Sequence, residues 1–514
     1  MAKNKTEEMV EKKPEEEEEG RVRTLTGVYP LNPPYVYAAV ERNPATGGLR
    51  YLLIEPKLSN QEISALDQIK DILVAELDVS LTELGSQENA EKYLRTKISE
   101  IIRKYKIKVP KESLEKLNYY LIRDFLGFGK IDGLMKDPEI EDISCNGPGV
   151  PVYVWHRVYE SIPTNIVFET EGELETFAVR LAYMSGRHVS LARPMLDASL
   201  PDGSRIQLNY GREVSRKGSS FTIRKFRADP LTVTDLIRYN TLSPEMAAYL
   251  WFMIENRVSV IIAGGIAAGK TTTLNVLANF IKPDLKIVSI EDTPEIRLLH
   301  ENWLPQVTRT GLGGEGGRTS DIELFDLLKA AVRQRPDYII VGEVRGAEAY
   351  TLFQAMATGH LGMCTIHAES VDAMIHRLES EPMNIPRTLL TTLDLIAVQR
   401  RVIFRDKVLR RIVTLSEIVG MDPATRELIT NEVYRWNPVN DAFERLRRSY
   451  RLEEIVKIRG MTMEEAEMEI ERRKEILEWM VKNNIRHYEQ VNKIIRDYYA
   501  NPDRLYKRIK VGVT

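Results

Sequence analysis

The sequence predicts an α/β protein of several domains, in which a parallel sheet carries a phosphate-binding loop. The first observation is a short apolar run over Val258–Ala263, typical of a buried strand, which leads directly into the pattern G-x-x-x-x-G-K-T. The second is a helical segment from Lys270 to about Ile281, which ends before Pro283. The third is the alternation of strand-length apolar runs with helical segments up to about Val419, which is typical of parallel sheets.

The glycine-rich stretch has the composition and the context of a nucleotide-binding loop. Glycines let the backbone wrap so that several N–H groups point at one phosphate, and the following helix adds the positive end of its dipole. Lys270 would reach the β- and γ-phosphates, and the Thr271 hydroxyl would hold Mg²⁺. A turn that binds nothing is the alternative, and the strand before the loop and the helix after it favour nucleotide binding. The expected contact residues are Gly264, Gly265, Ile266, Ala267, Ala268, Gly269, Lys270, Thr271 and Thr272.

Composition limits the classes of protein that the chain can belong to. At 514 residues it is too long for one ordinary core, and 43% apolar with 29% charged residues is typical of a globular protein with a well-solvated surface. The net charge of −3 does not predict a nucleic-acid partner. Two isolated cysteines support neither disulfides nor a zinc site, which favours a reducing cytosol. Because no run approaches eighteen apolar residues, we expect any membrane role to be played from outside the bilayer.

The chain divides by composition into a tail, two N-terminal parts, a linker and a nucleotide-binding part. Five consecutive glutamates at Glu15–Glu19 predict a disordered acidic tail. Ser59 and Glu62 form a capping-box pattern at the start of the first of three amphipathic helices. Apolar residues at helical spacing over Met463–Met480 are typical of a stripe that packs on its own domain, with a partner-docking helix as the alternative. The expected parts are residues 1–20 as the tail, 21–126 as a strand with a three-helix bundle, 127–227 as an α+β domain, 228–232 as the linker, and 233–514 as the ATPase domain with a C-terminal extension of strands and helices.

Two carboxylates follow predicted strands of the nucleotide-binding part. The apolar run from Asp337 ends in Glu343, and we expect this strand to lie beside the strand of the phosphate loop. Glu343 could then polarise the attacking water or hold Mg²⁺ through water. Glu291 follows the run Ile287–Ile290 and is a second candidate activator of water or metal, because ligands bind at the carboxyl ends of parallel strands.

His367 follows a further strand-length run, Met363–Ile366. A histidine at this edge of the sheet could contact the γ-phosphate, whereas a lone histidine is more often structural. From the residue chemistry alone, both interpretations stay open.

These motifs resemble those of the type II/type IV secretion and pilus-assembly ATPases, and the resemblance covers the chain from about Asp124 onward. Gly264–Thr271 is similar to their Walker A motif, Glu291–Glu295 to their Asp box, Arg335–Arg345 to their Walker B motif with its glutamate, and Thr358–Ala368 to their His box. The resemblance implies a RecA-like ATPase domain behind an α+β N-terminal domain. It also implies a functional role for His367.

The same resemblance implies that two arginines of the N-terminal domain take part in the reaction. The segments Pro201–Arg205 and Thr222–Phe226 are similar to the places that supply arginines to the γ-phosphate in this family. Arg205 and Arg224 are therefore candidates for γ-phosphate contacts within one subunit or from a neighbouring one, since charge on the phosphoryl oxygens favours a bidentate cation. Surface arginines on a β-hairpin are the alternative.

Within the family, the sequence resembles the archaeal branch. Two cysteines cannot build the four-cysteine zinc module of many bacterial members, and Arg297–Trp303 and Ile455–Glu465 look like archaeal segments. The overall pattern most resembles the archaellum motor ATPase, followed by archaeal pilus-assembly ATPases. This implies a cytoplasmic homo-hexamer, peripheral to the inner face of the membrane, with a polytopic membrane platform protein and other cytoplasmic motor components as partners.

Three other classes of protein compete with this interpretation. A nucleic-acid translocase shares the core fold, but the near-neutral charge and the absence of a basic, aromatic face disfavour it. A small-molecule kinase or a GTPase is disfavoured by the large flanking domains and by the absence of an N-K-x-D element. A scaffold that only binds nucleotide would need Lys270 and Thr271 but neither Glu343 nor Glu291.

Overall fold

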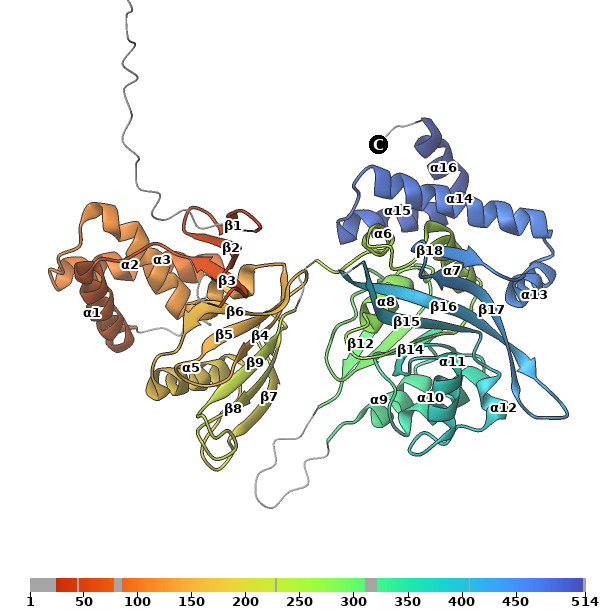
Figure 1. Ribbon diagram of the computed structural model, residues 1–514, viewed down its shortest axis with the longest axis horizontal. Helices are drawn as coiled ribbons and strands as arrows, with labels where there is room; N and C mark the ends of the chain where they lie inside the picture. The colour runs from red at the N-terminus through yellow and green to blue at the C-terminus, as the bar shows by residue number, and fades with distance from the viewer. Residues whose placement is uncertain are drawn as a thin grey trace, which may run out of the picture. The chain divides into compact units, whose positions relative to one another are not determined.

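The computed structural model describes residues 25–43, 46–77, 86–226, 229–309, 321–405 and 407–511. Two compact units, Met1–Arg227 and Ala228–Thr514, make up the chain (Figure 1). The predicted acidic tail lies outside the described residues. Each unit is built around its own nine-stranded sheet.

The sheet of the first unit is largely antiparallel and has the order β1-β2-β3-β6-β5-β4-β9-β8-β7. Among the described strands of this sheet, only β3 and β6 pair in parallel. The hairpin of β1 and β2, which turns at Pro33 and Pro34, was not predicted from the sequence, because its prolines are typical of an extended segment without pairing. The strands are β1 (Tyr29–Asn32), β2 (Val36–Arg42), β3 (Leu49–Ile54), β4 (Ile140–Cys145), β5 (Pro151–His156), β6 (Glu160–Val167), β7 (Met195–Ser199), β8 (Arg205–Asn209) and β9 (Ser220–Arg224).

Three helices of the first unit, α1 (Asn60–Glu76), α2 (Gln87–Lys104) and α3 (Leu114–Phe125), share a small apolar core of their own. The predicted capping box is confirmed, since Ser59 Oγ accepts from the N–H of Glu62 at 3.3 Å and the Glu62 carboxylate accepts from the N–H of Ser59 at 2.7 Å. α5 (Glu171–Met184) buries its apolar face against the sheet.

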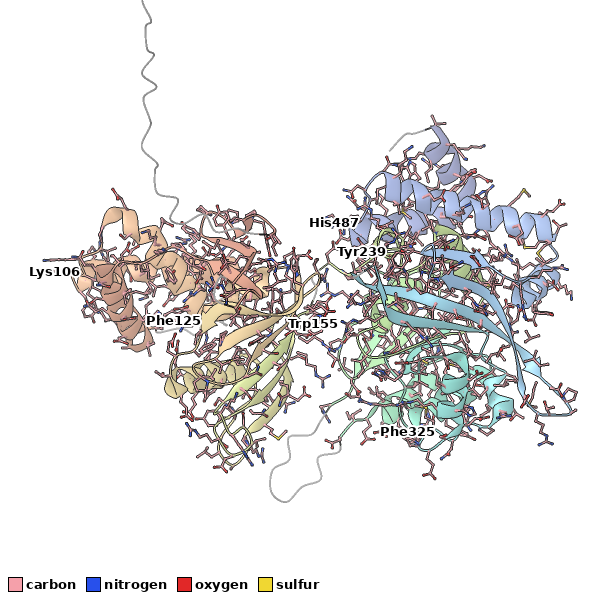
Figure 2. The ribbon with its side chains drawn as sticks, in the orientation of Figure 1. Lys106, Phe125, Trp155, Tyr239, Phe325 and His487 are labelled. Atoms are coloured by element: carbon pink, nitrogen blue, oxygen red, sulfur yellow. The ribbon has the colours of Figure 1, made fainter. Side chains whose placement is uncertain are left out.

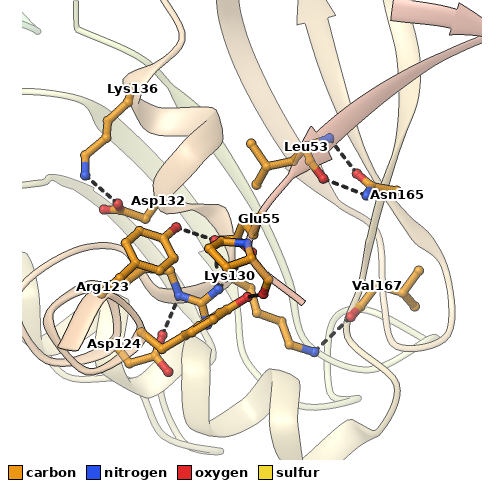
Figure 3. A network of polar contacts seen from close by, with 12 residues as sticks. Leu53, Glu55, Arg123, Asp124, Lys130, Asp132, Lys136, Asn165 and Val167 are labelled. Atoms are coloured by element: carbon orange, nitrogen blue, oxygen red, sulfur yellow. Dashed lines mark hydrogen bonds and ion pairs between the residues drawn. The ribbon is translucent and has the colours of Figure 1, made fainter. Parts of the chain in front are cut away.

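Polar contacts attach this helical layer to the sheet (Figure 3). Arg123 on α3 donates to both carboxylate oxygens of Glu55 at 3.0 Å and to Asp124 at 2.7 Å. The Asn165 side chain on β6 bonds the backbone N–H and C=O of Leu53 at 2.8 and 2.9 Å, which extends the β3–β6 junction. Because Arg123 is largely buried, loss of its paired carboxylates would leave its charge without a partner. These ion pairs therefore hold the helical layer firmly to the sheet.

The sheet of the second unit has the order β12-β11-β13-β14-β10-β15-β16-β17-β18. The strands from β12 to β15 pair in parallel, and those from β15 to β18 pair antiparallel. Separate apolar clusters cover its two faces, which explains why β10, β11 and β13 are buried along their whole length. The strands are β10 (Val260–Gly264), β11 (Ile287–Glu291), β12 (Trp303–Val307), β13 (Tyr338–Val341), β14 (Leu361–His367), β15 (Leu395–Phe404), β16 (Lys407–Met421), β17 (Leu428–Asn437) and β18 (Ala442–Arg445).

The predicted α/β fold class is confirmed, but one expected neighbour relation is wrong. The strand that precedes Glu343 is β13, and β14 separates it from the phosphate-loop strand β10. Chain order does not reveal this, because the later strand β14 inserts between the two. The helices of this α/β part are α6 (Val233–Arg238), α7 (Pro244–Glu255), α8 (Lys270–Ala278), α9 (Leu324–Val332), α10 (Glu348–Ala357), α11 (Val371–Glu379) and α12 (Arg387–Leu390).

The C-terminal helices pack on the second unit itself. Ala466, Ile470 and Met480 are buried in the same apolar cluster as α7, which confirms the predicted stripe. Arg473 on α14 is buried, pairs with Glu255 on α7, and lies over the rings of neighbouring aromatic residues. The helices are α13 (Tyr450–Arg459), α14 (Met463–Lys482), α15 (Tyr488–Ala500) and α16 (Pro502–Val511).

A buried carboxylate joins the long strand β16 to these helices. Glu417 is fully buried and its two oxygens accept hydrogen bonds from five donors. The donors are the Tyr249 hydroxyl at 2.8 Å, the Asn431 amide at 3.0 Å, the Ser449 hydroxyl, and the backbone N–H groups of Tyr450 and Arg451 at 2.9 and 3.3 Å. Because Tyr450 begins α13, this carboxylate caps that helix from the sheet.

Both cysteines are buried. Cys145 ends β4 and Cys364 lies on β14, and burial raises the pKa of each thiol. Among the helices of the described part, none has the length and apolar character needed to cross a bilayer.

Candidate nucleotide-binding site

The loop between β10 and α8 has a backbone that only particular residues accommodate. A side chain at Gly264 would place its Cβ 2.2 Å from the carbonyl oxygen of Gln399, so that position requires glycine. Gly269, which caps α8, has a φ of +89°, and Ala267 has a φ of +57°. Both residues therefore lie in the left-handed region, which is costly for alanine.

Lys270 lies inside this loop. It is 7% exposed, and its Nζ donates to the carbonyl oxygen of Gly265 at 2.9 Å. Burial lowers the pKa of its ammonium, although the nearby Glu343 carboxylate acts in the opposite direction. Thr271 and Thr272 are half-buried in the first turn of α8, Ala268 is buried, and Ile266 is exposed at the loop tip. The predicted loop residues thus form one concave backbone turn at a helix N-terminus.

Two of the other predicted residues meet beside Lys270. His367, at the end of β14, is in register with Gly264 of β10. Its Nε2 lies 3.3 Å from Oε1 of Glu343, which follows β13 by two residues. Burial and the positive charge of Lys270 lower the pKa of His367, although the Glu343 carboxylate acts in the opposite direction, so the neutral imidazole is the favoured form at this contact.

Glu291, the second candidate activator of water or metal, is buried at the end of β11. It is 3% exposed, and its Oε1 accepts the backbone N–H groups of Glu295 and Ile296, each at 2.9 Å. Burial raises the pKa of the Glu291 carboxyl to about 7. A Cβ on Gly342 would lie 3.2 Å from its side chain, so Glu291 packs directly behind the segment that carries Glu343. In this structure its carboxyl closes the turn after β11.

The donors expected for a metal suit Mg²⁺. Thr271 and Glu343 supply hydroxyl and carboxylate oxygens, the hard ligands that this ion prefers. Within the described ranges, no cluster of three or more acidic, histidine or cysteine side chains could hold a metal by itself.

Arg205 and Arg224 belong to the first unit. They face each other on neighbouring strands β8 and β9, and each pairs with an aspartate. Arg205 donates to both oxygens of Asp197 at 3.0 and 2.8 Å, whereas Arg224 Nε lies 3.4 Å from Asp142. Both arginines line an open groove of about 710 Å³ on the sheet. Trp155, which Figure 2 labels, lines the same groove. Like charges directly opposite on adjacent strands repel, and the two aspartates offset this cost.

Sequence patterns did not identify two residues that contact the phosphate loop from the other side. Gln399 on β15 is in register with Gly264, opposite to His367. Arg410 on β16 donates from Nε to the carbonyl oxygen of Ala267 at 3.0 Å. Neither residue lies in a motif, and their position becomes evident only from the order of strands.

Comparison with known proteins gives a family for most of the chain. The profile of the family described as "Type II/IV secretion system protein" matches residues 131–505. An uncharacterized protein of Methanocaldococcus jannaschii is 40% identical over 496 residues, which is 92% of this chain and 88% of that protein. The type IV secretion system protein PtlH of Bordetella pertussis is 30% identical over 48% of this chain and 78% of its own length. The ATPase DotB of Legionella pneumophila, a solved structure, is 15% identical, covers 76% of this chain and 96% of its own, and has a TM-score of 0.42.

Proposed function

The chain belongs to the type II/IV secretion system protein family and is an ATP hydrolase of that family, and from this premise we propose that it is a Mg²⁺-dependent hexameric motor for a surface filament. The filament we propose is the archaellum, which the motor would assemble and rotate through a membrane platform protein. The proposed ATP hydrolysis rests on one observation. Lys270, Glu343 and His367 lie close together beside the phosphate loop, at the carboxyl edge of the parallel sheet.

Each of these residues has a role that its surroundings support. The loop backbone and Lys270 would hold the β- and γ-phosphates, and Thr271, with Glu343 through water, would hold Mg²⁺, which would offset negative charge on the phosphates. Glu343 would orient and deprotonate the attacking water. His367, whose Nε2 lies 3.3 Å from Oε1 of Glu343, would hold that carboxylate in place and contact the γ-phosphate side. We assign Glu291 a supporting role behind Glu343, where its buried carboxyl accepts the backbone N–H groups of Glu295 and Ile296.

Arg205 and Arg224 would stabilise the charge that develops on the γ-phosphoryl oxygens. Their adjacency gives two guanidinium groups in one groove, and Asp197 orients the first of them through a bidentate pair. In a ring of identical subunits, such arginines can complete the site of a neighbour. Loss of γ-phosphate contacts after hydrolysis would then release them and let the two units of the chain reorient.

The archaeal setting rests on similarity. The relative from Methanocaldococcus jannaschii that is 40% identical to this chain is archaeal. The two isolated cysteines, which cannot form a four-cysteine module, agree with that branch. As a motor the protein would work in the cytoplasm at the inner face of the membrane, with the platform protein and other motor components as partners. An archaeal type IV pilus or type II-like secretion ATPase is the second candidate, since the family description includes secretion and does not name a filament.

The test is a chromosomal Lys270→Ala replacement in the organism that encodes the chain, beside Glu343→Gln and a Lys282→Ala control. Swimming assays and electron microscopy of surface filaments follow, with protein levels compared by immunoblot. Loss of motility filaments with intact adhesive pili supports the archaellum. Loss of pili with motility kept establishes the second candidate. If neither changes while the altered protein is present at normal level, the filament function is wrong.

A nucleic-acid translocase is tested with the purified protein. Turnover stimulated by DNA, with a steep fall as salt rises, would favour it. We expect no stimulation, because the net charge is −3.

A further inference from the structure

We propose that Gln399 and Arg410 are positioning residues that hold the phosphate loop in its binding shape from the side opposite to His367. The inference rests on the proposed function, since it presumes that the loop binds a nucleotide. It adds two residues of the β15–β16 pair, outside every recognised motif, to the determinants of nucleotide affinity (Figure 1 shows the two strands side by side).

The first observation is where these side chains meet the loop. The two left-handed residues between β10 and α8 are Ala267 and Gly269, and each has a neighbour from β15–β16. Arg410 Nε donates to the Ala267 carbonyl at 3.0 Å. A Cβ on Gly269 would lie 3.0 Å from Gln399 Nε2 and 3.3 Å from Arg410 Cδ. The least favourable part of the loop backbone is therefore the part that these two side chains touch.

The second observation is the burial of Gln399. Its side chain is 1% exposed, and its Oε1 finds no hydrogen-bond partner among the residues that the structure describes. Its backbone carbonyl also occupies the space that any side chain at Gly264 would need. A buried amide whose oxygen has no hydrogen-bond partner destabilises the fold, so a glutamine at this position calls for a reason other than stability. The proximity of the Gln399 amide to Gly269 indicates that this reason is to position the loop.

The geometry also explains why the contact favours binding. A phosphate loop binds through inward-pointing backbone N–H groups, which leaves carbonyls such as that of Ala267 free to face outward. Arg410 takes one of these outward carbonyls, and its charge aligns the peptide that follows Ala267. A loop fixed in this shape before the nucleotide arrives does not lose conformational freedom on binding, which raises affinity.

The experiment measures the Kd of a fluorescent ATP analogue, with KM and kcat, in the full-length protein. For Arg410→Ala we expect a Kd about tenfold weaker and a KM raised to match, because a charge-assisted hydrogen bond is lost. At saturating ATP, kcat should stay within about twofold of the wild-type value, because the reacting groups are untouched. Arg410→Lys should recover most of the affinity. Arg405→Ala, an exposed arginine of the same hairpin, should bind within about twofold of wild type.

Gln399→Met separates positioning from simple stability. Methionine has a similar length and leaves no unpaired acceptor, so thermal stability should stay the same or rise. Affinity should nevertheless fall several-fold, and amide hydrogen exchange over residues 264–271 should become faster without nucleotide. Unchanged affinity in both Gln399→Met and Arg410→Ala overturns the inference, as does an equal loss in Arg405→Ala. If the wild-type protein binds no nucleotide, the proposed function fails instead.

Discussion

Glu343 and His367 come from the ends of two strands and meet 3.3 Å apart beside Lys270. The contact with the imidazole would orient the Glu343 carboxylate, which the proposed activation of water requires. Glu343→Gln preserves the shape and removes the base. We expect turnover to fall by about 100-fold or more while ATP affinity stays within about threefold. Steady-state hydrolysis and nucleotide titration check this, and unchanged turnover would rule out the assigned role.

Glu291 makes the stability of the second unit depend on pH. Its carboxyl has a pKa of about 7 in the folded protein and of 4.5 when it is exposed to water, as in the unfolded chain. Between these two pH values the unfolded chain has lost this proton and the folded chain still holds it. The unfolding free energy is therefore highest below about pH 4.5 and declines as the pH rises through 7. Relative to Glu291→Gln, the wild type should lose about 3 kcal/mol of unfolding free energy between pH 4.5 and pH 8. Urea unfolding at several pH values measures the difference, and the exposed Glu301→Gln serves as control. Parallel pH curves for wild type and Glu291→Gln would contradict it.

At this scale the sequence predicted residues that lie in motifs and missed those that do not. Lys270, Glu343 and His367 follow buried strands with recognisable spacing, and the structure brings them together. The burial of Glu291 was not predicted, because its two partners are backbone N–H groups that carry no residue identity. Gln399 and Arg410 reach the loop through lateral strand pairing, which a single sequence does not display.

Among elements, β16 connects the loop with the C-terminal helices. It carries Arg410 near one end and Glu417 further along, where the buried carboxylate caps α13. Glu417→Gln puts an NH₂ group among five donors, so at least one of them loses its acceptor. We expect a loss of about 3 kcal/mol in unfolding free energy. Chemical denaturation measures it, with the more exposed Glu432→Gln, which pairs with Arg435, as control. A difference below about 0.5 kcal/mol would show that the carboxylate is not an anchor.

Elements with strong local signals were predicted well. α1 begins at the predicted Ser59 cap, and the stripe on α14 is buried, because caps and helical periodicity are local properties. The β1–β2 hairpin was missed since its prolines mask its alternation. The insertion of β14 between β10 and β13 depends on how helical connections cross the sheet, and chain order alone does not fix it.

For the whole molecule, the arginines of the first unit offer a test of ring assembly. Arg224→Ala and Glu343→Gln should each be nearly inactive. If the arginine acts on a neighbouring subunit, rings mixed from both variants contain some intact sites, and activity should return to about a quarter of wild type. Mixtures are made by co-expression and assayed for hydrolysis at several protein concentrations.

The control for this test is Arg212→Ala, an exposed arginine of the same unit that pairs with Glu171 at 2.7 and 2.8 Å. It should keep wild-type turnover. Mixtures that stay as inactive as each variant alone would place the arginine within its own subunit. A turnover per subunit that does not change on dilution would speak against a site completed at an interface.

Because both native cysteines are buried, the unmodified chain should react little with thiol reagents. Thiol reagents attack the exposed thiolate, and burial removes Cys145 and Cys364 from that reaction. A cysteine introduced at an exposed position in each unit, such as Val158 and Ile458, would therefore take a fluorophore or spin label without removal of native residues. The separation of the two labels, measured with and without ATP, would test whether the two units reorient during hydrolysis.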